Sequence, residues 1–411
     1  MATWTASPGT ASTALGTQHY MNPKVIAEHD DVVLLSTAGK LLRCAGVATA
    51  VLALLLGIYF VVDGIYGMSA GYTGRIFQAA SAPLIGLIIG VLASALLQSS
   101  STTTALTVAA VGTGAIGVPV AIPLILGSNI GTTLTALVAS FSYVRHPEAF
   151  RQALTTAFLH PWFNALMVAI VFPLELALHP LQSLSQSIAR LALHPGDHAP
   201  TGDIVMPGPL YPLIQALGTQ GLIGRMAPSV AGFLCAVIGA LLIFLGLRAM
   251  RLLLRSLFAA TTLSALERTV GGSTAAGVAT GAVGTAVIQS STVAIVSLLP
   301  FAATRTLTQR EGLALILGAN VGTTVGALLA FWALPDSTLS VFALQAALVH
   351  VIFNVLGALL VLLIPGAQRG LLRLASLSAA ATSRRPLGVL AALTAAYLGL
   401  PALILALVVA L

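Results

Sequence analysis

The feature that most constrains this fold is a run of seven polar residues, Gln98 to Thr104, within a tract that has no charged side chain between Arg75 and Arg145. In hydrocarbon, non-helical polar backbone is tolerated only where it is buried in protein or lines a water-filled cavity. We therefore expect this run to line a buried cavity. A related sequence, Gln289-Ser290-Ser291-Thr292, recurs later in the chain.

Composition places the chain among polytopic membrane proteins. Hydrophobic residues make up 57% of the sequence and charged residues 7%, whereas a typical soluble domain has about 25% charged residues. The net charge of +7 comes from residues scattered through loops, so we expect no nucleic-acid partner. Cys44 and Cys235 lie in apolar segments and predict neither a disulfide framework nor a transition-metal site. Residues 1–40 lack an apolar core, which predicts a cytosolic tail rather than a cleavable signal peptide.

Seven apolar segments have the roughly 20 residues that a membrane crossing requires. These segments are residues 41–66, 118–141, 152–178, 228–247, 311–334, 340–364 and 387–411. Asp63 stands near the end of the first segment and is predicted to be a membrane-interface residue rather than part of a buried site.

Two further segments, residues 83–117 and 277–304, each combine two short apolar arms with a polar tip. An arm of about 14 residues covers about 20 Å, less than the roughly 30 Å of the hydrocarbon core. These segments predict re-entrant helical hairpins. The spans at 118–141 and 311–334 contain Gly-x-Asn-x-Gly-Thr-Thr motifs, at 127–133 and 318–324, and these predict broken helices.

The polar positions recur at a fixed spacing, which predicts a duplicated fold. Three pairs are 191 residues apart: Gln98 with Gln289, Asn129 with Asn320, and Thr132 with Thr323. Two pairs are 190 residues apart: His160 with His350, and Asn164 with Asn354. We place the two repeats at residues 41–178 and 228–365. A Pro-rich linker at 179–227 joins them, and a cytosolic loop and a last transmembrane helix follow in 366–411.

The basic residues predict how the repeats are oriented. Three crossings in each repeat, an odd number, require the second copy to enter the membrane inverted. With the N-terminus in the cytoplasm, fifteen of the 18 Lys and Arg residues lie on the inner side, and Arg75, Arg190 and Arg225 lie outside. This bias follows the positive-inside rule and places the linker outside the cell. Inverted repeats with discontinuous helices are typical of secondary transporters.

The polar centre predicts a cation-coupled anion site. Helix N-termini with free N–H groups bind anions, and amide, carbonyl and hydroxyl oxygens suit a hard cation such as Na⁺. No basic residue lies in either hairpin or broken helix, so a bound oxyanion needs co-bound cations to offset its charge. The alternative is that Ser and Thr pack the helices as small residues. We favour it less because the Gln-Ser-Ser motif occurs in both hairpins.

Two other functional classes are weaker. A channel needs a continuous polar pore, whereas the polar residues here are concentrated at one depth. An intramembrane serine hydrolase could use Ser100 with His160, but the sequence has no Gly-x-Ser-x-Gly turn and no acid to orient the histidine. We therefore expect a transporter and no enzymatic activity.

The paired motifs resemble those of the type II sodium/phosphate cotransporters. The resemblance covers residues 80–180 and 270–365 and includes the two His-x-x-Phe-Asn motifs at 160–164 and 350–354. It implies Na⁺-coupled uptake of inorganic phosphate across a lipid bilayer, with Na⁺ as the coupling ion and no cofactor. Another oxyanion or a small dicarboxylate as cargo, phosphate export and a homodimer are left open.

The sequence also departs from that family. Its second Gln-Ser-Ser motif is one Ser shorter than the first, which leaves the second ligand set open. The loop at 179–227 has no Cys and no Asn-x-Ser/Thr acceptor, so the bridged, glycosylated loop of the animal proteins is absent. We therefore expect a bacterial inner-membrane location.

The hypothesis assigns three sets of site residues. The phosphate set is Gln98, Ser99, Ser100, Thr102, Gln289, Ser290, Ser291 and Thr292. The sodium set is Gln98, Ser101, Asn129, Thr132, Gln289, Asn320 and Thr323. The supporting set is Thr133, Thr324, His160, Asn164, His350 and Asn354. Its histidines and asparagines are expected to hold a neighbouring helix by hydrogen bonds, and the threonines that follow the helix breaks could be simple caps. For the two Gln and two Asn residues, a role in capping helices or in tying hairpin to helix is equally open.

Overall fold

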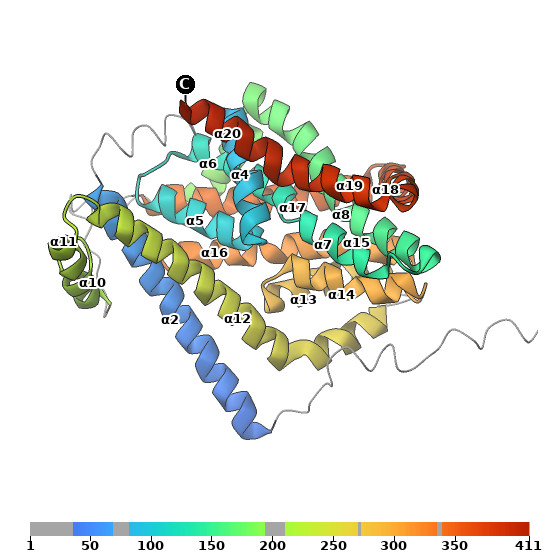
Figure 1. The fold of residues 1–411 in the computed structure, drawn as a ribbon, viewed down its shortest axis with the longest axis horizontal. Coiled ribbons are helices and arrows are strands. Elements are labelled where there is room, and N and C mark those ends of the chain that lie inside the picture. Colours follow the sequence, from blue (N-terminus) through green and yellow to red (C-terminus); the bar gives the residue numbers. More distant parts are fainter. Residues whose placement is uncertain (1–35, 69–81, 194–209, 270–272, 335–338, 411) are drawn as a thin grey trace, which may run out of the picture.

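A computed structural model describes residues 36–68, 82–193, 210–269, 273–334 and 339–410, which form helices joined by turns (Figure 1). Seven of the described helices are long and apolar enough to cross a membrane, as predicted. They are Thr37–Gly64, Val118–Tyr143, Pro147–Leu178, Ala231–Leu254, Gln309–Trp332, Ser340–Leu363 and Pro386–Val408. The prediction of an all-α polytopic membrane protein is therefore confirmed. Most of the predicted tail, residues 1–40, lies outside the described residues.

Each predicted hairpin consists of two short helices around a tight turn. Helices α4 (Pro83–Leu97) and α13 (Thr274–Ile288) have 15 residues, and α5 (Ser100–Gly112) and α14 (Ser291–Ala303) have 13. These lengths correspond to about 22 and 20 Å, too short to cross a bilayer core of about 30 Å. The turns lie at Gln98–Ser99 and Gln289–Ser290.

The first arm of each hairpin packs closely on the following helix, α6 (Val118–Gly131) or α15 (Gln309–Thr323). A Cβ added to Gly127 would lie 2.1 Å from the Leu87 carbonyl oxygen, and one added to Gly318 would lie 2.0 Å from the Val278 carbonyl oxygen. Close approach of backbones at glycine is common between membrane helices. The same contact geometry recurs 191 residues apart at Gly90 and Gly281, and at Gly131 and Gly322.

These glycines therefore pack helices, and the predicted helix breaks are narrower than expected. Helix α6 continues through Gly131, and α7 (Leu134–Ser140) begins after two intervening residues. Likewise, α15 reaches Thr323 and α16 (Val325–Trp332) begins after Thr324. The Thr132 φ and ψ of −66° and −18° remain right-handed. The breaks predicted in these motifs are confined to residues 132–133 and to Thr324, because the glycines accommodate a neighbouring helix without leaving helical geometry.

We expect Gly127→Ala and Gly318→Ala each to lower the free energy of unfolding by at least about 1–3 kcal/mol, the usual cost of overpacking. The added methyl group would meet backbone carbonyls that can move only with their helix. Thermal unfolding in detergent measures the effect. Gly370→Ala is the matched control, because its Cβ would meet no atom within 4 Å. Equal melting temperatures for Gly127→Ala and the control would contradict the close packing.

The two halves of the chain interlock through the second hairpin arms. Helix α5 contacts α16 and α17 (Ser340–Leu363), whereas α14 contacts α7 and α8 (Pro147–Leu178). Helices α2 (Thr37–Gly67) and α12 (Ala231–Thr269) pack along each other at one side of the fold, where α12 also contacts α13 (Figure 1). Gly57 and Gly239 allow this contact, since a Cβ on either would lie within 3 Å of the other's carbonyl oxygen.

Two amphipathic helices extend the repeat beyond its predicted ends. Helix α9 (Pro180–Ala192) begins the region predicted as a linker and packs on α17, while α18 (Ala367–Arg384) replaces a predicted loop and packs on α8. Their buried stripes match at a spacing of 190: Leu181, Ser185 and Ala189 in α9, and Leu371, Ala375 and Ala379 in α18. The sequence did not predict these two helices, because small side chains pack well without giving a strongly apolar sequence. The division into repeats, linker and last span stays a prediction.

The remaining segments are short or peripheral. Between the halves lie α10 (Tyr211–Leu217) and α11 (Leu222–Met226). Asp63 is half-buried and accepts hydrogen bonds from the Thr219 backbone N–H at 2.7 Å and hydroxyl at 2.8 Å, so it ties α2 to this region. The C-terminal span consists of α19 (Pro386–Thr394), the π-helical turn η2 (Ala395–Gly399) and α20 (Leu400–Ala410).

Candidate functional site

Both hairpin tips have the same strained backbone. Gln98 has φ 51° and ψ 34°, and Gln289 has φ 56° and ψ 31°, both in the left-handed region. Non-glycine residues adopt this region uncommonly, and such strain tends to cluster at functional sites. Each glutamine is followed by a serine, Ser99 or Ser290, in an extended N-cap conformation. The repeat therefore preserves an unusual turn.

The hydroxyl oxygens of the N-cap serines accept hydrogen bonds from the helix that follows. The Ser99 Oγ atom accepts from the Thr102 N–H at 3.1 Å and the Thr102 hydroxyl at 2.9 Å, so its own proton remains available. In α14, the Ser290 Oγ atom accepts from the Val293 N–H at 3.2 Å. The first N–H groups of each helix have no intrahelical acceptor and carry the positive end of its dipole. Each tip can therefore bind an anion.

The hairpin tips bring candidate residues of the two halves together at two places. The Thr132 and Thr292 hydroxyl oxygens lie 3.3 Å apart, which joins the break after α6 to the tip of α14. At the second place, a Cβ added to Gly326 would lie 3.2 Å from Gln289 Oε1 and 3.4 Å from Ser101 Oγ. The tips of both hairpins thus flank α16. Sequence reasoning missed Gly326, which lies outside every polar motif.

Two buried polar networks tie each Gly-x-Asn helix to the long span of the other half. The Asn129 Oδ1 atom accepts from His350 Nε2 and Asn354 Nδ2, both at 3.3 Å, and its Nδ2 donates to the Ile125 carbonyl oxygen at 2.9 Å. The arrangement recurs with Asn320 as acceptor, His160 and Asn164 as donors, and Ile316 as the carbonyl. These bonds favour the tying role for the two asparagines over direct ion binding. The supporting role of the His-x-x-Phe-Asn motifs at a transport site stays a prediction.

We expect Asn320→Ala to lower the free energy of unfolding by about 2–5 kcal/mol, because it leaves two buried donors without an acceptor. The donors are His160 Nε2 and Asn164 Nδ2. Chemical denaturation in detergent checks this value. Ser142→Ala is a control that removes an exposed hydroxyl bonded to its own helix. A loss no larger than that of the control would contradict the network.

The side chains of the two tip glutamines differ in burial. Gln289 is 4% exposed, and its Oε1 has no hydrogen-bond partner among the described residues. Gln98 is exposed. The predicted equivalence therefore holds for the backbone but not for side-chain burial, because the surroundings of α4 and α13 differ. Among the remaining candidates, Thr323 and Thr324 bond carbonyls of their own helix at 2.6 and 2.7 Å. Their ligand or supporting roles stay predictions.

Buried polar atoms without a partner gather around this region. In the described part of the chain they are Ser94 Oγ, Thr285 Oγ1, His160 Nδ1, His350 Nδ1, Asn164 Oδ1, Asn354 Oδ1 and Gln289 Oε1. The first six form three repeat-related pairs. Groups of this kind in a membrane interior call for water, an ion or a ligand as partner. Sequence reasoning missed Ser94 and Thr285, although their spacing of 191 and their place in apolar arms were visible.

Comparison with known proteins fits this geometry. The sequence family described as Na⁺/Pi-cotransporter matches residues 53–193 and 241–398. The chain belongs to this family. The resemblance inferred from the motifs is thereby confirmed, and the family is one of transporters rather than enzymes.

Curated relatives carry names in agreement with the family. The human sodium-dependent phosphate transport protein 2B is 36% identical over 193 residues, covering 44% of this chain and 28% of that protein. The rat 2A protein is 29% identical over 345 residues, which cover 68% of this chain and 54% of that protein. The sheep 2A protein is 28% identical over 395 residues, which cover 78% of this chain and 62% of that protein. The chain thus spans about a quarter to three-fifths of the length of these relatives. No solved structure gives a significant match.

Proposed function

We propose that this protein is a secondary transporter that couples Na⁺ entry to uptake of inorganic phosphate. The observation that carries the proposal is the repeated Gln–Ser turn, with N-cap serines whose protons remain available, in hairpins without a basic side chain. The names of the relatives support phosphate and sodium as the transported pair.

In this proposal, phosphate lies at the N-termini of α5 and α14. The Ser99 and Ser290 hydroxyls and the first N–H groups of both helices donate to its oxygens. Because no arginine or lysine is present in the hairpins to balance the phosphate charge, Na⁺ does so. Oxygen atoms of Ser101, Thr132 and Gln289 are the nearest candidates, since they lie where the two halves meet.

The proposed topology has inverted repeats and re-entrant hairpins, with the N-terminus in the cytoplasm. Hydrogen bonds join residues predicted on the same side of the membrane. Arg305 pairs with Glu148, and Thr156 donates to Gln309 at 2.8 Å, all near the predicted inner face. On the predicted outer side, Gln345 donates to the Gln182 carbonyl oxygen at 3.0 Å. The proposed location remains the inner membrane of a bacterium.

Transport would require the hairpins to move with the helices that they contact. The glycine contacts hold α4 to α6 and α13 to α15, and the cross-repeat networks add α8 and α17. These helices together form a candidate moving body. The paired helices α2 and α12, which lie at one side of the fold, are the candidate scaffold (Figure 1).

Uptake of radiolabelled phosphate into proteoliposomes tests the proposal. We expect an inward Na⁺ gradient to drive accumulation, and an equal K⁺ gradient or no gradient to give none. Uptake independent of Na⁺ would overturn coupling. Uptake of another oxyanion or a dicarboxylate without phosphate would overturn the cargo. Efflux from loaded vesicles without Na⁺-driven accumulation would instead indicate an exporter.

A further inference from the structure

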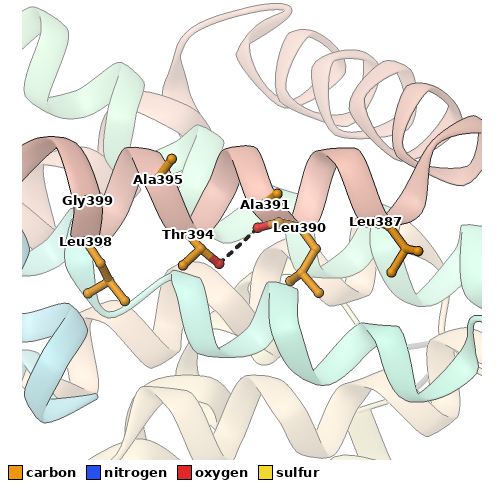
Figure 2. Close-up of a pocket in the computed structure, with 7 residues that line it drawn as sticks. All are labelled: Leu387, Leu390, Ala391, Thr394, Ala395, Leu398 and Gly399. Carbon is orange, nitrogen blue, oxygen red and sulfur yellow. Dashed lines mark hydrogen bonds between the residues drawn. The ribbon is translucent and has the colours of Figure 1, made fainter.

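The C-terminal span makes little contact with the rest of the molecule. Only 6% of the residues in the most apolar stretch of this span are buried, whereas the corresponding share is 33–78% in the other six candidate spans. One face of this span is apolar, with leucine, alanine and glycine around Thr394, which donates to the Leu390 carbonyl oxygen of its own helix at 3.0 Å (Figure 2). Nearby contacts with the hairpin run from η2 and α20 to α4.

One polar side chain of this span nevertheless reaches the candidate site. The Tyr397 hydroxyl oxygen lies 2.7 Å from Thr133 Oγ1. The Thr133 hydroxyl donates its single proton to the Ile130 carbonyl oxygen at 2.8 Å. Thr133 must therefore accept, and Tyr397 donates. Thr133 follows Thr132, whose hydroxyl lies 3.3 Å from that of Thr292 at the tip of α14.

The backbone around Tyr397 is locally unusual. Tyr397 is the central residue of η2, and this π-helical turn interrupts an otherwise α-helical span. Single π turns are rare and occur frequently at functional sites. A π turn in the middle of a lipid-exposed helix thus coincides with the residue that contacts the helix break.

The contact breaks the symmetry between the repeats. Thr324, 191 residues after Thr133, has the same bond to a preceding carbonyl oxygen, that of Val321 at 2.7 Å. The C-terminal span lies outside the duplicated segments and supplies its tyrosine to the first repeat. Among the described residues, a hydroxyl from outside the repeats therefore contacts Thr133 but not the matching Thr324.

We propose that Tyr397 is a positioning residue that fixes Thr133 and, through the shared break, holds the Thr132 hydroxyl against Thr292, and thereby sets the affinity of this half of the site for Na⁺. Its effect on transport rests on the proposed function. The C-terminal span thus acts on one repeat only and contributes no ligand of its own.

Purified protein in detergent and proteoliposomes provide two measurements. The first is the rise in melting temperature with NaCl relative to KCl, which reports Na⁺ binding independently of transport. The second is the Na⁺ dependence of phosphate uptake. We expect Tyr397→Phe, which removes only the hydroxyl, to raise the Na⁺ concentration for half-maximal effect by about 3- to 10-fold, the equivalent of one net hydrogen bond. The maximal uptake rate should change less than about twofold.

Variants of the two threonines separate positioning from general stabilisation. Tyr397→Phe should have no further effect on Na⁺ affinity in a Thr133→Val background, and its full effect in a Thr324→Val background. A lower melting temperature with unchanged Na⁺ affinity would overturn the proposal in favour of a purely structural tyrosine. Additive effects with Thr133→Val would also overturn it. Absence of phosphate uptake by the wild type, together with a Na⁺-dependent melting shift that needs more Na⁺ in Tyr397→Phe, would refute the proposed function and support the positioning role.

Discussion

Gln289→Ala is expected to reduce Na⁺-coupled phosphate uptake by about 10- to 150-fold, the effect of losing one hydrogen bond or ligand contact to a charged group. The Gln289 Oε1 atom is buried, has no partner among the described residues, and lies beside Gly326 where the two hairpin tips meet. Alanine retains a Cβ, so the left-handed backbone at this position costs about as much as before. Uptake into proteoliposomes measures the loss.

A smaller loss is expected for Gln98→Ala, because the Gln98 side chain is exposed whereas that of Gln289 is buried, although the two turns share their backbone geometry. Gln215→Ala, which removes an exposed glutamine in α10, is the matched control and should transport normally. Melting temperatures near that of the wild type would show that both tip variants fold. Normal transport by either tip variant would refute a site that uses both hairpins.

The second large effect is expected at Gly326. In Gly326→Ala, the new Cβ would lie 3.2 Å from Gln289 Oε1 and from Ser101 Cβ, closer than most Cβ contacts. One of the two tips must therefore shift. We expect at least about a tenfold loss of uptake, as sub-ångström displacement of a positioned group can cost. Alanine also favours a helix over glycine by about 1 kcal/mol, so stability should be retained.

Gly370→Ala serves as the control for this change too, since its Cβ would meet open space in another helix. The two variants should have similar melting temperatures but differ in uptake. Equal uptake by Gly326→Ala and Gly370→Ala would show that transport does not depend on the present distance between the two hairpin tips at Gly326. A large fall in melting temperature for Gly326→Ala would assign the glycine to packing alone.

The sequence predicted the features that repeat. Polar residues at a spacing of 191 located both hairpin tips, and the apolar segment lengths predicted seven crossings. The roles of the glycines in 127–131 were misassigned, because a motif of small residues is compatible with a helix break and with close packing. The close contact of these glycines with the backbone of α4 shows that they pack helices, and α4 is a separate part of the sequence.

The partners across the halves could not be predicted from one sequence. His160 Nε2 lies 3.3 Å from Asn320 Oδ1, although 160 residues separate the two in the sequence. The repeat spacing relates His160 to His350 and Asn320 to Asn129, so it does not indicate this contact. The tyrosine at 397 lies in a span without a counterpart in the duplication, so no periodicity indicated it. Helices α9 and α18 were missed because their buried stripes consist mostly of small residues.

The most direct test of the central claim is a ligand-bound structure determined in NaCl and phosphate. We expect phosphate between the N-termini of α5 and α14, within hydrogen-bond distance of the Ser99 and Ser290 hydroxyls, with Na⁺ near Thr132, Ser101 and Gln289. Phosphate bound elsewhere, or held by an arginine or lysine side chain instead of the two hairpin tips, would contradict the account.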